Sequence, residues 1–308
     1  MTSNSELRFD GDVAIVSGAG RGLGRAYAMH LASRGAQVVV NDIDQEAAQA
    51  VCDEITAAGG QAHADSHPIG DAEGSRAIVK TALDAFGKVT ILVNNAGIIS
   101  YASFAELTDD QWDSMKTVNL DGTYYLCKAV WPIFQEQKYG RIVNTTSNGG
   151  YAGYPTLAHY GTVKAAILGL TKVLAHEGAE HGIVVNAIAP MAVTRMNAEQ
   201  VYGNAEPQEE TWQQDIADGK VPMGPASVVA PAVTWLSHRD TDVTGEVFSV
   251  SSGKVGRVAI VVGDGFFDPD LEPEALRDHE QRVRSIESYF EPIQTADEVM
   301  LIPALFQR

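Results

Sequence analysis

The sequence predicts an α/β fold in which helices cover both faces of a doubly wound parallel sheet, giving three layers. Short runs of β-branched residues alternate with longer amphipathic segments from residue 13 onward, as in repeated βαβ units. The strand-like runs are apolar throughout rather than alternating, so both faces of the sheet must be buried. Right-handed crossovers between six such strands lead to this architecture.

The expected elements follow one another in a regular order as far as residue 188. Strands are expected at 13–16, 37–41, 90–93, 141–145 and 183–188, with a further strand ahead of Asp65. Helices are expected at 21–34, 44–58, 75–86, 109–137 and 160–180, and the stretch 109–137 is long enough for one helix or two. Glycines close several of these helices, as Gly35 does, which is a common C-terminal signal.

The second half of the chain departs from this alternation. Residues 191–225 are rich in Asn, Glu, Gln and Pro with only a weak helical pattern, which is typical of a mobile lid. A helix at 228–237 and a closing strand at 247–250 follow, and the acidic tail carries one helical pattern at 273–289. We expect a single domain at 8–262 that includes the lid, and a C-terminal extension at 263–308.

Composition excludes several classes of function. The 308 residues include 22 Lys+Arg against 40 Asp+Glu, and a net charge of −18 would repel a nucleic-acid backbone. No apolar signal segment or stretch long enough to span a membrane is present, so we expect a cytoplasmic protein. Cys52 and Cys127 fit neither a metal-binding spacing nor a disulfide framework, which predicts two reduced core thiols and no metal site.

A glycine-rich loop follows the first expected strand. It reads Ser17-Gly18-Ala19-Gly20-Arg21-Gly22-Leu23-Gly24 and has the spacing G-x-x-x-G-x-G rather than G-x-G-x-x-G. Glycines at this place allow a tight turn from strand to helix and let the backbone approach a pyrophosphate at the helix N-terminus. The loop therefore predicts a dinucleotide site.

Asp42 indicates which dinucleotide is preferred. It ends the second expected strand, 18 residues after Gly24, where a carboxylate would meet the adenosine ribose hydroxyls and repel a 2′-phosphate. Arg21 inside the loop would attract that phosphate. A mobile, solvated arginine stabilises the phosphate less than the desolvated carboxylate of Asp42 destabilises it. We expect NAD, with NADP less favoured; the alternative role for Asp42 is a helix N-cap.

Several motifs occur in a specific order. They are the glycine loop, Asn94-Asn95-Ala96-Gly97, Ser147, Tyr160-x-x-x-Lys164 and Asn186-Ala187-Ile188-Ala189-Pro190. Together they resemble the short-chain dehydrogenase/reductase family over about residues 8 to 262. Within the family, the segments at 8–11, 24–27 and 40–42 are most similar to the (3R)-hydroxyacyl-CoA dehydrogenase domains of peroxisomal multifunctional enzymes and to bacterial 17β-hydroxysteroid dehydrogenase-like members.

The resemblance implies a Rossmann fold, an NAD(P)-dependent alcohol dehydrogenase or ketoreductase, and a homotetramer or dimer. It implies a cofactor site made of Ser17, Gly18, Arg21, Gly22, Leu23, Gly24, Asp42, Asp65, Asn94, Ala96, Gly97, Tyr160, Lys164, Pro190 and Thr194. Asp65 resembles the residue that contacts the adenine amino group, with a cap or turn role as the alternative. Ser17 stands where the family usually has threonine, and Met191 where glycine is commoner.

The resemblance also implies four catalytic residues, which are Asn119, Ser147, Tyr160 and Lys164. Tyr160 can act as the base, because Lys164 shares its helix face and a nearby ammonium favours the phenolate. Ser147 can hydrogen-bond the reacting oxygen. Asn119 matches the residue that anchors a water chain to Lys164, and an asparagine inside a helix needs such a reason.

The substrate is expected to be bulky and hydrophobic. Tyr151, Tyr154, Met191 and Met196 are apolar or aromatic and near the active site, although they could simply pack the lid. Residues 191–225 hold two cations against six anions, which favours a neutral alcohol such as a steroid over a 3-hydroxyacyl-CoA. The competing hypothesis is a non-catalytic dinucleotide-binding sensor or scaffold on the same fold, against which the intact catalytic residues argue.

Overall fold

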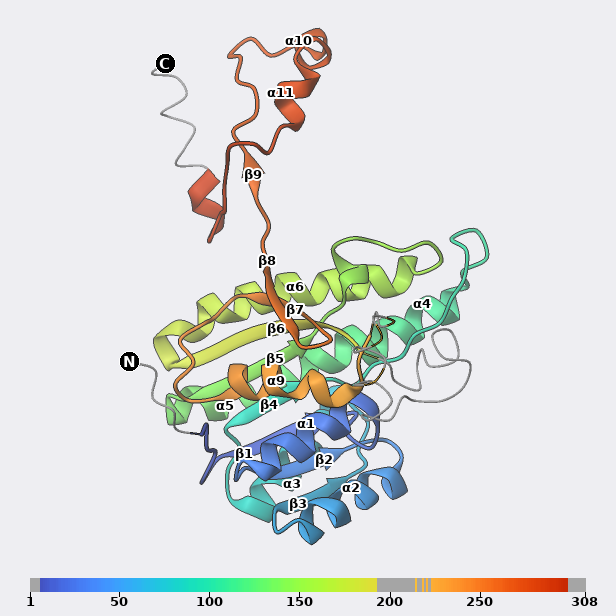
Figure 1. Cartoon of the computed structure of the whole chain (residues 1–308), viewed down its shortest axis with the longest axis vertical. Helices are drawn as coiled ribbons and strands as arrows, with labels where there is room; N and C mark the ends of the chain where they lie inside the picture. Colours follow the sequence, from blue (N-terminus) through green and yellow to red (C-terminus); the bar gives the residue numbers. More distant parts are fainter. Residues whose placement is uncertain (1–5, 193–213, 215–217, 219, 221–222, 299–308) are drawn as a thin grey trace. The chain divides into compact units, whose positions relative to one another are not determined.

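The computed structural model describes residues 6–192, 214, 218, 220 and 223–298 (Figure 1). The chain divides into two compact units, Met1–Arg257 and Val258–Arg308. Within the described part of the chain, no helix is long and apolar enough to cross a membrane. The same residues contain no cluster of His, Cys, Asp and Glu that could hold a metal ion.

The larger unit is built on one eight-stranded sheet with the order β3-β2-β1-β4-β5-β6-β7-β8. Its strands are β1 Val13–Ser17, β2 Gln37–Asn41, β3 Gln61–Asp65, β4 Ile91–Asn94, β5 Gly140–Thr145, β6 Ile183–Met191, β7 Val247–Ser251 and β8 Lys254–Val258. All pairs from β3 to β7 are parallel. The strand order changes direction at β1, and a doubly wound sheet opens a crevice there, at the carboxyl ends of its strands.

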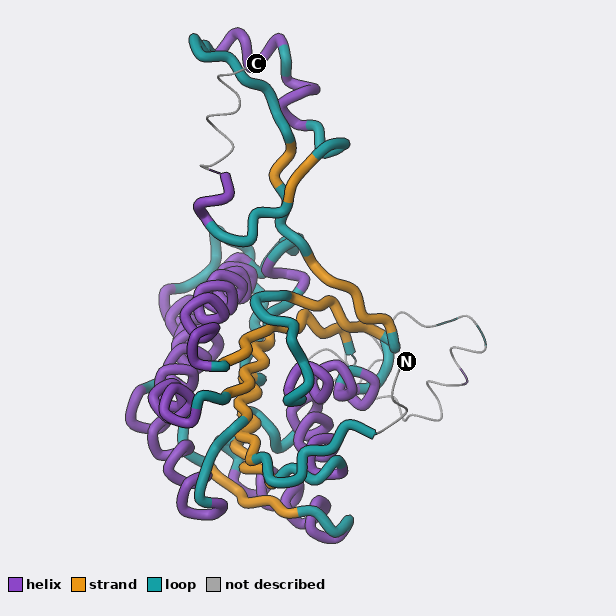
Figure 2. Tube along the Cα trace, turned by 90° about the vertical axis from the view of Figure 1, so that its left-hand side faces the viewer, coloured by secondary structure: helices purple, strands orange, loops and turns teal. Residues whose placement is uncertain are grey.

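Helices cover both faces of this sheet, as Figure 2 shows. They are α1 Gly22–Ser33, α2 Gln45–Ala57, α3 Ala72–Phe86, α4 Asp109–Met115, α5 Gly122–Gln137, α6 Ala158–Gly178 and α9 Ala230–Ser237, with short 3-10 turns at Asn148–Gly150, Ala179–His181 and Ala226–Val228. Tyr27 of α1, Val51 of α2 and Leu236 of α9 pack into the core on one face. Ile78 of α3 and Phe134 of α5 belong to the core on the other.

The predicted fold class is confirmed, with local differences. The stretch 109–137 is one continuous helical path in which a π-helical segment, Lys116–Asp121, joins α4 to α5. β8 was not predicted; it follows β7 after a two-residue turn in which Ser252 and Gly253 have φ of 48° and 79°. Two positive φ values are typical of a tight hairpin turn. The expected lid begins inside β6 at Met191, and most of it lies outside the described residues.

The smaller unit corrects one expectation. The helical pattern at 273–289 predicts one helix, but the structure has α10 Pro273–Asp278, α11 Glu280–Arg284 and the strand β10 Tyr289–Phe290, which pairs antiparallel with β9 Val262–Gly263. The helix is interrupted at His279, whose φ and ψ are −115° and 21°. Neither short helix buries a residue, and without a buried apolar face nothing stabilises a single longer helix.

Candidate active site

A cavity of about 1600 Å³ lies at the carboxyl ends of the parallel strands. Its walls come from the segments that follow β1, β2, β3, β4, β5 and β6. The predicted site residues that line it are Gly18, Arg21, Gly22, Leu23, Asp42, Ala96, Gly97, Asn119, Ser147, Tyr154, Tyr160, Lys164, Pro190 and Met191. Thr194 and Met196 lie outside the described residues.

Other predicted residues do not line the cavity. These are Ser17, Gly24, Asp65, Asn94 and Tyr151. Ser17, Asp65 and Asn94 are buried behind its wall, and Tyr151 is 42% exposed outside it. Asn94 Nδ2 donates to Asn144 Oδ1 at 2.9 Å, which ties β4 to β5. These buried polar side chains hold the segments that form the site.

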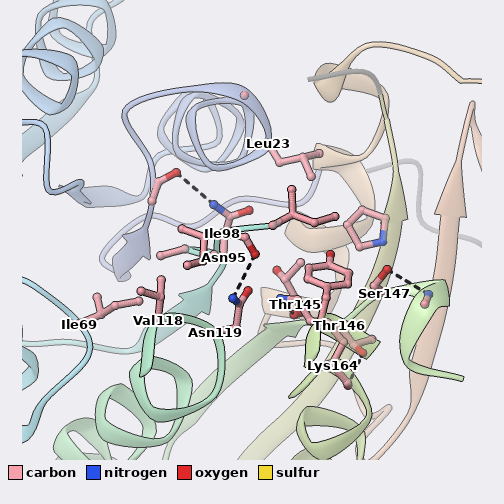
Figure 3. A pocket seen from close by; sticks show the side chains of 18 of the residues that line it. Leu23, Ile69, Asn95, Ile98, Val118, Asn119, Thr145, Thr146, Ser147 and Lys164 are labelled. Atoms are coloured by element: carbon pink, nitrogen blue, oxygen red, sulfur yellow. Dashed lines mark hydrogen bonds between the residues drawn. The ribbon is translucent and has the colours of Figure 1, made fainter. Parts of the chain in front are cut away.

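The glycine loop is docked against the segment after β4. Ser17 Oγ accepts the backbone N–H groups of Asn95 and Ala96, each at 3.1 Å. Asn95 Nδ2, at the end of the labelled side chain in Figure 3, donates in return to the carbonyl oxygens of Ser17 and Gly18 at 3.0 and 3.1 Å. Gly18 has a φ of +61°, and a Cβ there would lie 2.7 Å from Ala96 Cα. The tight turn therefore requires glycine.

The start of α1 has the properties of an anion site. A Cβ on Gly24 would lie 2.2 Å from the carbonyl oxygen of Gly18, so the loop and helix approach more closely than any other residue allows. Arg21, at the N-cap, makes no side-chain cap hydrogen bond, and the first turn contains no acid. The first backbone N–H groups beside the cavity are thus left for an anion, which fits the pyrophosphate of a dinucleotide.

Asp42 stands between this loop and α2. Its Oδ2 accepts the backbone N–H of Gly20 at 2.9 Å, and its Oδ1 accepts that of Asp44 at 3.1 Å. Asp44 is the N-cap of α2, accepting from Ala47, so capping is not the role of Asp42. Arg21 pairs with Asp44 at 2.5 Å, and this hydrogen bond raises the pKa of the guanidinium. The loop cation is therefore already engaged.

Ser147 and Lys164 lie near each other at the β5 and α6 side of the cavity (Figure 3). Tyr160, one turn before Lys164 in α6, also lines this cavity. Lys164 is buried, its Nζ donates to the carbonyl oxygen of Thr145 at 2.9 Å, and burial lowers its pKa to about 8. This Nζ lies 5.7 Å from the centroid of the Tyr160 ring. Burial raises the pKa of Tyr160, while its hydrogen bond with Ser147 acts in the opposite direction.

Asn119 lies in the π-helical segment, where such irregular turns often mark functional positions. Its Nδ2 donates to the carbonyl oxygen of Ile98 at 3.1 Å (Figure 3). The same Nδ2 donates to the carbonyl oxygen of Met115 at 3.2 Å. Among the described residues no group donates to its buried Oδ1. A Cβ on Gly97 would lie 2.5 Å from this oxygen and 3.7 Å from Lys164 Nζ, so glycine leaves open the space that both polar atoms border.

Sequence reasoning missed several residues that shape the site. Asn95 binds the glycine loop. The sequence motif Asn94-Asn95-Ala96-Gly97 includes this residue, but Asn95 was not predicted to be a site residue. Thr146 Oγ1 donates to the carbonyl oxygen of Lys164 at 2.7 Å and fixes α6 against β5. Asn148 Nδ2 contacts Met191 Sδ at 3.3 Å beside Ser147. His67 also lines the cavity, and no motif pointed to it.

Comparisons with known proteins agree with this geometry. A family model described as short chain dehydrogenase matches residues 12–204. Peroxisomal multifunctional enzyme A of Dictyostelium discoideum is 37% identical over 302 residues, which are 95% of this chain and 64% of that protein. The structure of full-length peroxisomal multifunctional enzyme type 2 from Drosophila melanogaster has a TM-score of 0.80 at 29% identity, covering 98% of this chain and 50% of that one.

A further solved structure is a 7α-hydroxysteroid dehydrogenase complexed with NADH and 7-oxo glycochenodeoxycholic acid. It has a TM-score of 0.72 at 31% identity and covers 83% of this chain and 98% of that one. This chain spans only part of the two multifunctional enzymes, at 64% and 50% of their lengths. From the family match and these relatives, the chain belongs to the short-chain dehydrogenase/reductase family and is an oxidoreductase.

Proposed function

We propose that the protein transfers a hydride between NAD and a secondary alcohol or ketone of a bulky hydrophobic substrate. The observation that carries this proposal is the placement of Ser147, Tyr160 and Lys164 at one side of a cavity whose other side holds Asp42 and the glycine loop. One cavity thus offers both a dinucleotide cradle and an acid–base group.

The reacting side chains have distinct roles. When bound, NAD supplies the nicotinamide carbon that accepts the hydride. Tyr160 removes the proton from the alcohol oxygen, and Ser147 holds that oxygen by a hydrogen bond. With a pKa of about 8, Lys164 is still mostly protonated at neutral pH, and its positive charge stabilises the phenolate of Tyr160. Asn119 orders the polar space next to Lys164 and acts as a positioning residue.

The contacts of Asp42 support NAD over NADP. Its carboxylate faces the cavity beside the glycine loop, where it accepts the ribose hydroxyls and repels a 2′-phosphate. Arg21 would be the attracting cation, but its guanidinium is paired with Asp44. We also assign Pro190 to the nicotinamide side, since it lines the cavity where β6 ends.

The lining of the cavity supports a neutral substrate. Tyr154, Leu157 and Met191 present apolar surface near Ser147. Among the described residues that line the cavity, the lysine and arginine side chains are Arg21 and Lys164, and both are engaged. Coenzyme A phosphates would find no further cation there. We therefore place a hydroxysteroid-type alcohol ahead of a 3-hydroxyacyl-CoA.

The test is NADH formation at saturating NAD, with a 17β-hydroxysteroid and a 3-hydroxyacyl-CoA compared by kcat/KM. Tyr160→Phe should bind NADH normally and lose at least about 10²-fold in kcat, because it removes the proton acceptor. Tyr151→Phe, which removes a hydroxyl outside the cavity, is the matched control. An unchanged rate in Tyr160→Phe would refute the mechanism. NADH binding without turnover of any secondary alcohol would favour the sensor or scaffold.

We also propose a homodimer or homotetramer. The exposed apolar side chains Tyr124 of α5 and Val173 of α6, 46% and 53% exposed, support association through these helices. Sedimentation at micromolar concentration tests this, and a monomer would refute it. The cytoplasmic location stays a prediction, since the Dictyostelium and Drosophila relatives are named as peroxisomal proteins.

A further inference from the structure

The chain between β4 and α4 borders the cavity as a loop, and residues 98–103 form neither helix nor strand. Ile99 and Tyr101 line the cavity. Ser100 and Ala102, which alternate with them, do not. This alternation is typical of an extended chain, in which successive side chains point to opposite sides. We call residues 98–103 the β4 loop.

Hydrogen bonds to two other segments hold the ends of the β4 loop. Asn119 of the π-helical segment donates through Nδ2 to the carbonyl oxygen of Ile98 at 3.1 Å (Figure 3). The backbone N–H of Ala102 donates to the carbonyl oxygen of Thr156 at 3.1 Å. Thr156 lines the cavity and has a φ of 69°, which is rare for a β-branched residue. Such a conformation persists only where the surrounding structure enforces it, so this contact is a fixed feature.

The middle of the β4 loop is held by a pair of side chains. Ser100 Oγ lies 2.8 Å from Nε2 of His159, which stands in the first turn of α6 directly before Tyr160. His159 is fully buried, and burial lowers the pKa of its imidazole, which is therefore neutral. Among the described residues nothing forms a hydrogen bond with its Nδ1. The buried ring thus depends on Ser100 for its polar contact.

Tyr101 brings the β4 loop to the reacting centre. It lines the same cavity as Tyr160. Burial and, to a smaller degree, the charge of Tyr101 raise the pKa of Tyr160, so the two phenols lie within electrostatic reach of each other. A substrate whose alcohol carbon is held between Ser147 and Tyr160 therefore places its adjoining carbons against this part of the loop.

We propose that His159 is a positioning residue: its hydrogen bond with Ser100 holds the β4 loop as a preformed wall against the apolar body of the substrate. Ile99 and Tyr101 supply the contacts. The inference rests on the proposed alcohol oxidation. A released loop would have to be ordered by the substrate, at a cost in affinity, whereas proton transfer at Tyr160 would proceed as before. Loss of the hydrogen bond should raise KM about tenfold and change kcat by less than about twofold.

The kinetic experiment measures KM and kcat at saturating NAD with the 17β-hydroxysteroid, or with the 3-hydroxyacyl-CoA if wild type prefers it. His159→Leu and Ser100→Ala should each raise KM about tenfold, and the double variant should go no further, because both substitutions remove the same bond. His159→Gln should keep the wild-type KM, because its amide can still bond Ser100. Ser103→Ala is the matched control, since it removes a hydroxyl of the same loop that donates to Glu106.

Hydrogen exchange of the β4 loop gives a readout that does not need turnover. The amide protons of residues 99–103 should exchange at least about tenfold faster in His159→Leu and Ser100→Ala, because the released loop opens more often. Exchange in His159→Gln and Ser103→Ala should match wild type. Thermal unfolding verifies that each variant folds, and Ser100→Ala carries the test if His159→Leu does not.

The outcomes separate the two levels of the argument. Wild-type exchange and wild-type KM in His159→Leu and Ser100→Ala would overturn the role of His159 and leave the proposed function standing. Faster exchange with an unchanged KM would show that the loop is no wall of the substrate site, and a loss of kcat at unchanged KM would assign His159 to the chemical step; either would overturn the inference. A wild-type protein that oxidises neither alcohol would overturn the proposed function and this inference together.

Discussion

Removing the hydroxyl of Ser17 should destabilise the protein by about 2 kcal/mol. Its Oγ accepts two backbone N–H groups, those of Asn95 and Ala96, each at 3.1 Å. An unsatisfied donor costs about 1–3 kcal/mol, and because both donors are only part-buried we take the lower end for each. For a chain of 308 residues, the melting temperature should fall by about 3 °C.

Urea and thermal unfolding of Ser17→Ala measure this difference. Ser33→Ala is the matched control, because its exposed Oγ only donates to the carbonyl oxygen of His30. The control should stay within about 0.5 kcal/mol of wild type. A free energy of unfolding for Ser17→Ala equal to that of the control would show that the two N–H groups find other partners, and would refute the reasoning.

Three further predictions follow from the site and its scaffold. Burial lowers the pKa of Lys164 from 10.5 to about 8, so the unfolded chain holds this proton more tightly. Below pH 8, burial of the charged ammonium lowers the free energy of unfolding by about 3 kcal/mol. This destabilisation disappears as the pH rises from 8 towards 10.5, because the folded protein loses the proton first. Wild type should therefore gain stability relative to Lys164→Met across that window in urea titrations, and parallel curves would contradict it. Asp42→Asn should shift the ratio of the NADPH and NADH Kd values about tenfold towards NADPH, since the amide no longer repels the 2′-phosphate; an unchanged ratio would remove Asp42 from nucleotide selection. Gly24→Ala should lose at least about 2 kcal/mol of stability, because its Cβ would lie 2.2 Å from a carbonyl oxygen. Gly256→Ala, whose added Cβ meets nothing within 4 Å in β8, should gain about 0.5–1 kcal/mol, and equal effects in the two variants would disprove the steric argument.

The central strands could be predicted because their continuous apolar sequences indicate burial on both faces of the sheet. β1 and β4 are apolar up to their last residues, Ser17 and Asn94, and the structure buries every residue of both. β8 was missed because only two residues of its sequence are hydrophobic and its residues are exposed or half-buried, so only the Ser252-Gly253 turn signalled it. The helix expected at 273–289 failed for the opposite reason, since its periodic apolar residues meet no core.

Candidate site residues could be named from motifs, but their partners could not. The quartet indicated Asn94, yet nothing in the sequence showed that Asn95 would clasp the glycine loop. Asp65 was named for adenine contact, which stays a prediction, and nothing in the sequence showed that Asn41, His67 and Thr81 would donate to its carboxylate. Hydrogen bonds between segments far apart in the chain depend on tertiary packing, which no local pattern records.

The π-helical segment Lys116–Asp121 has a consequence for how this site tolerates changes in chain length. A π turn holds one residue more than an α turn, and each residue of an α-helix advances by about 100° around the axis. Deleting Thr117 would let α4 and α5 merge into a regular helix and would rotate the two halves against each other by that angle. The helix itself would persist. The amide of Asn119, however, would rotate away from the carbonyl oxygen of Ile98 and from the space that it shares with Lys164. The alignment of this side chain is therefore encoded in the number of residues as much as in their identity.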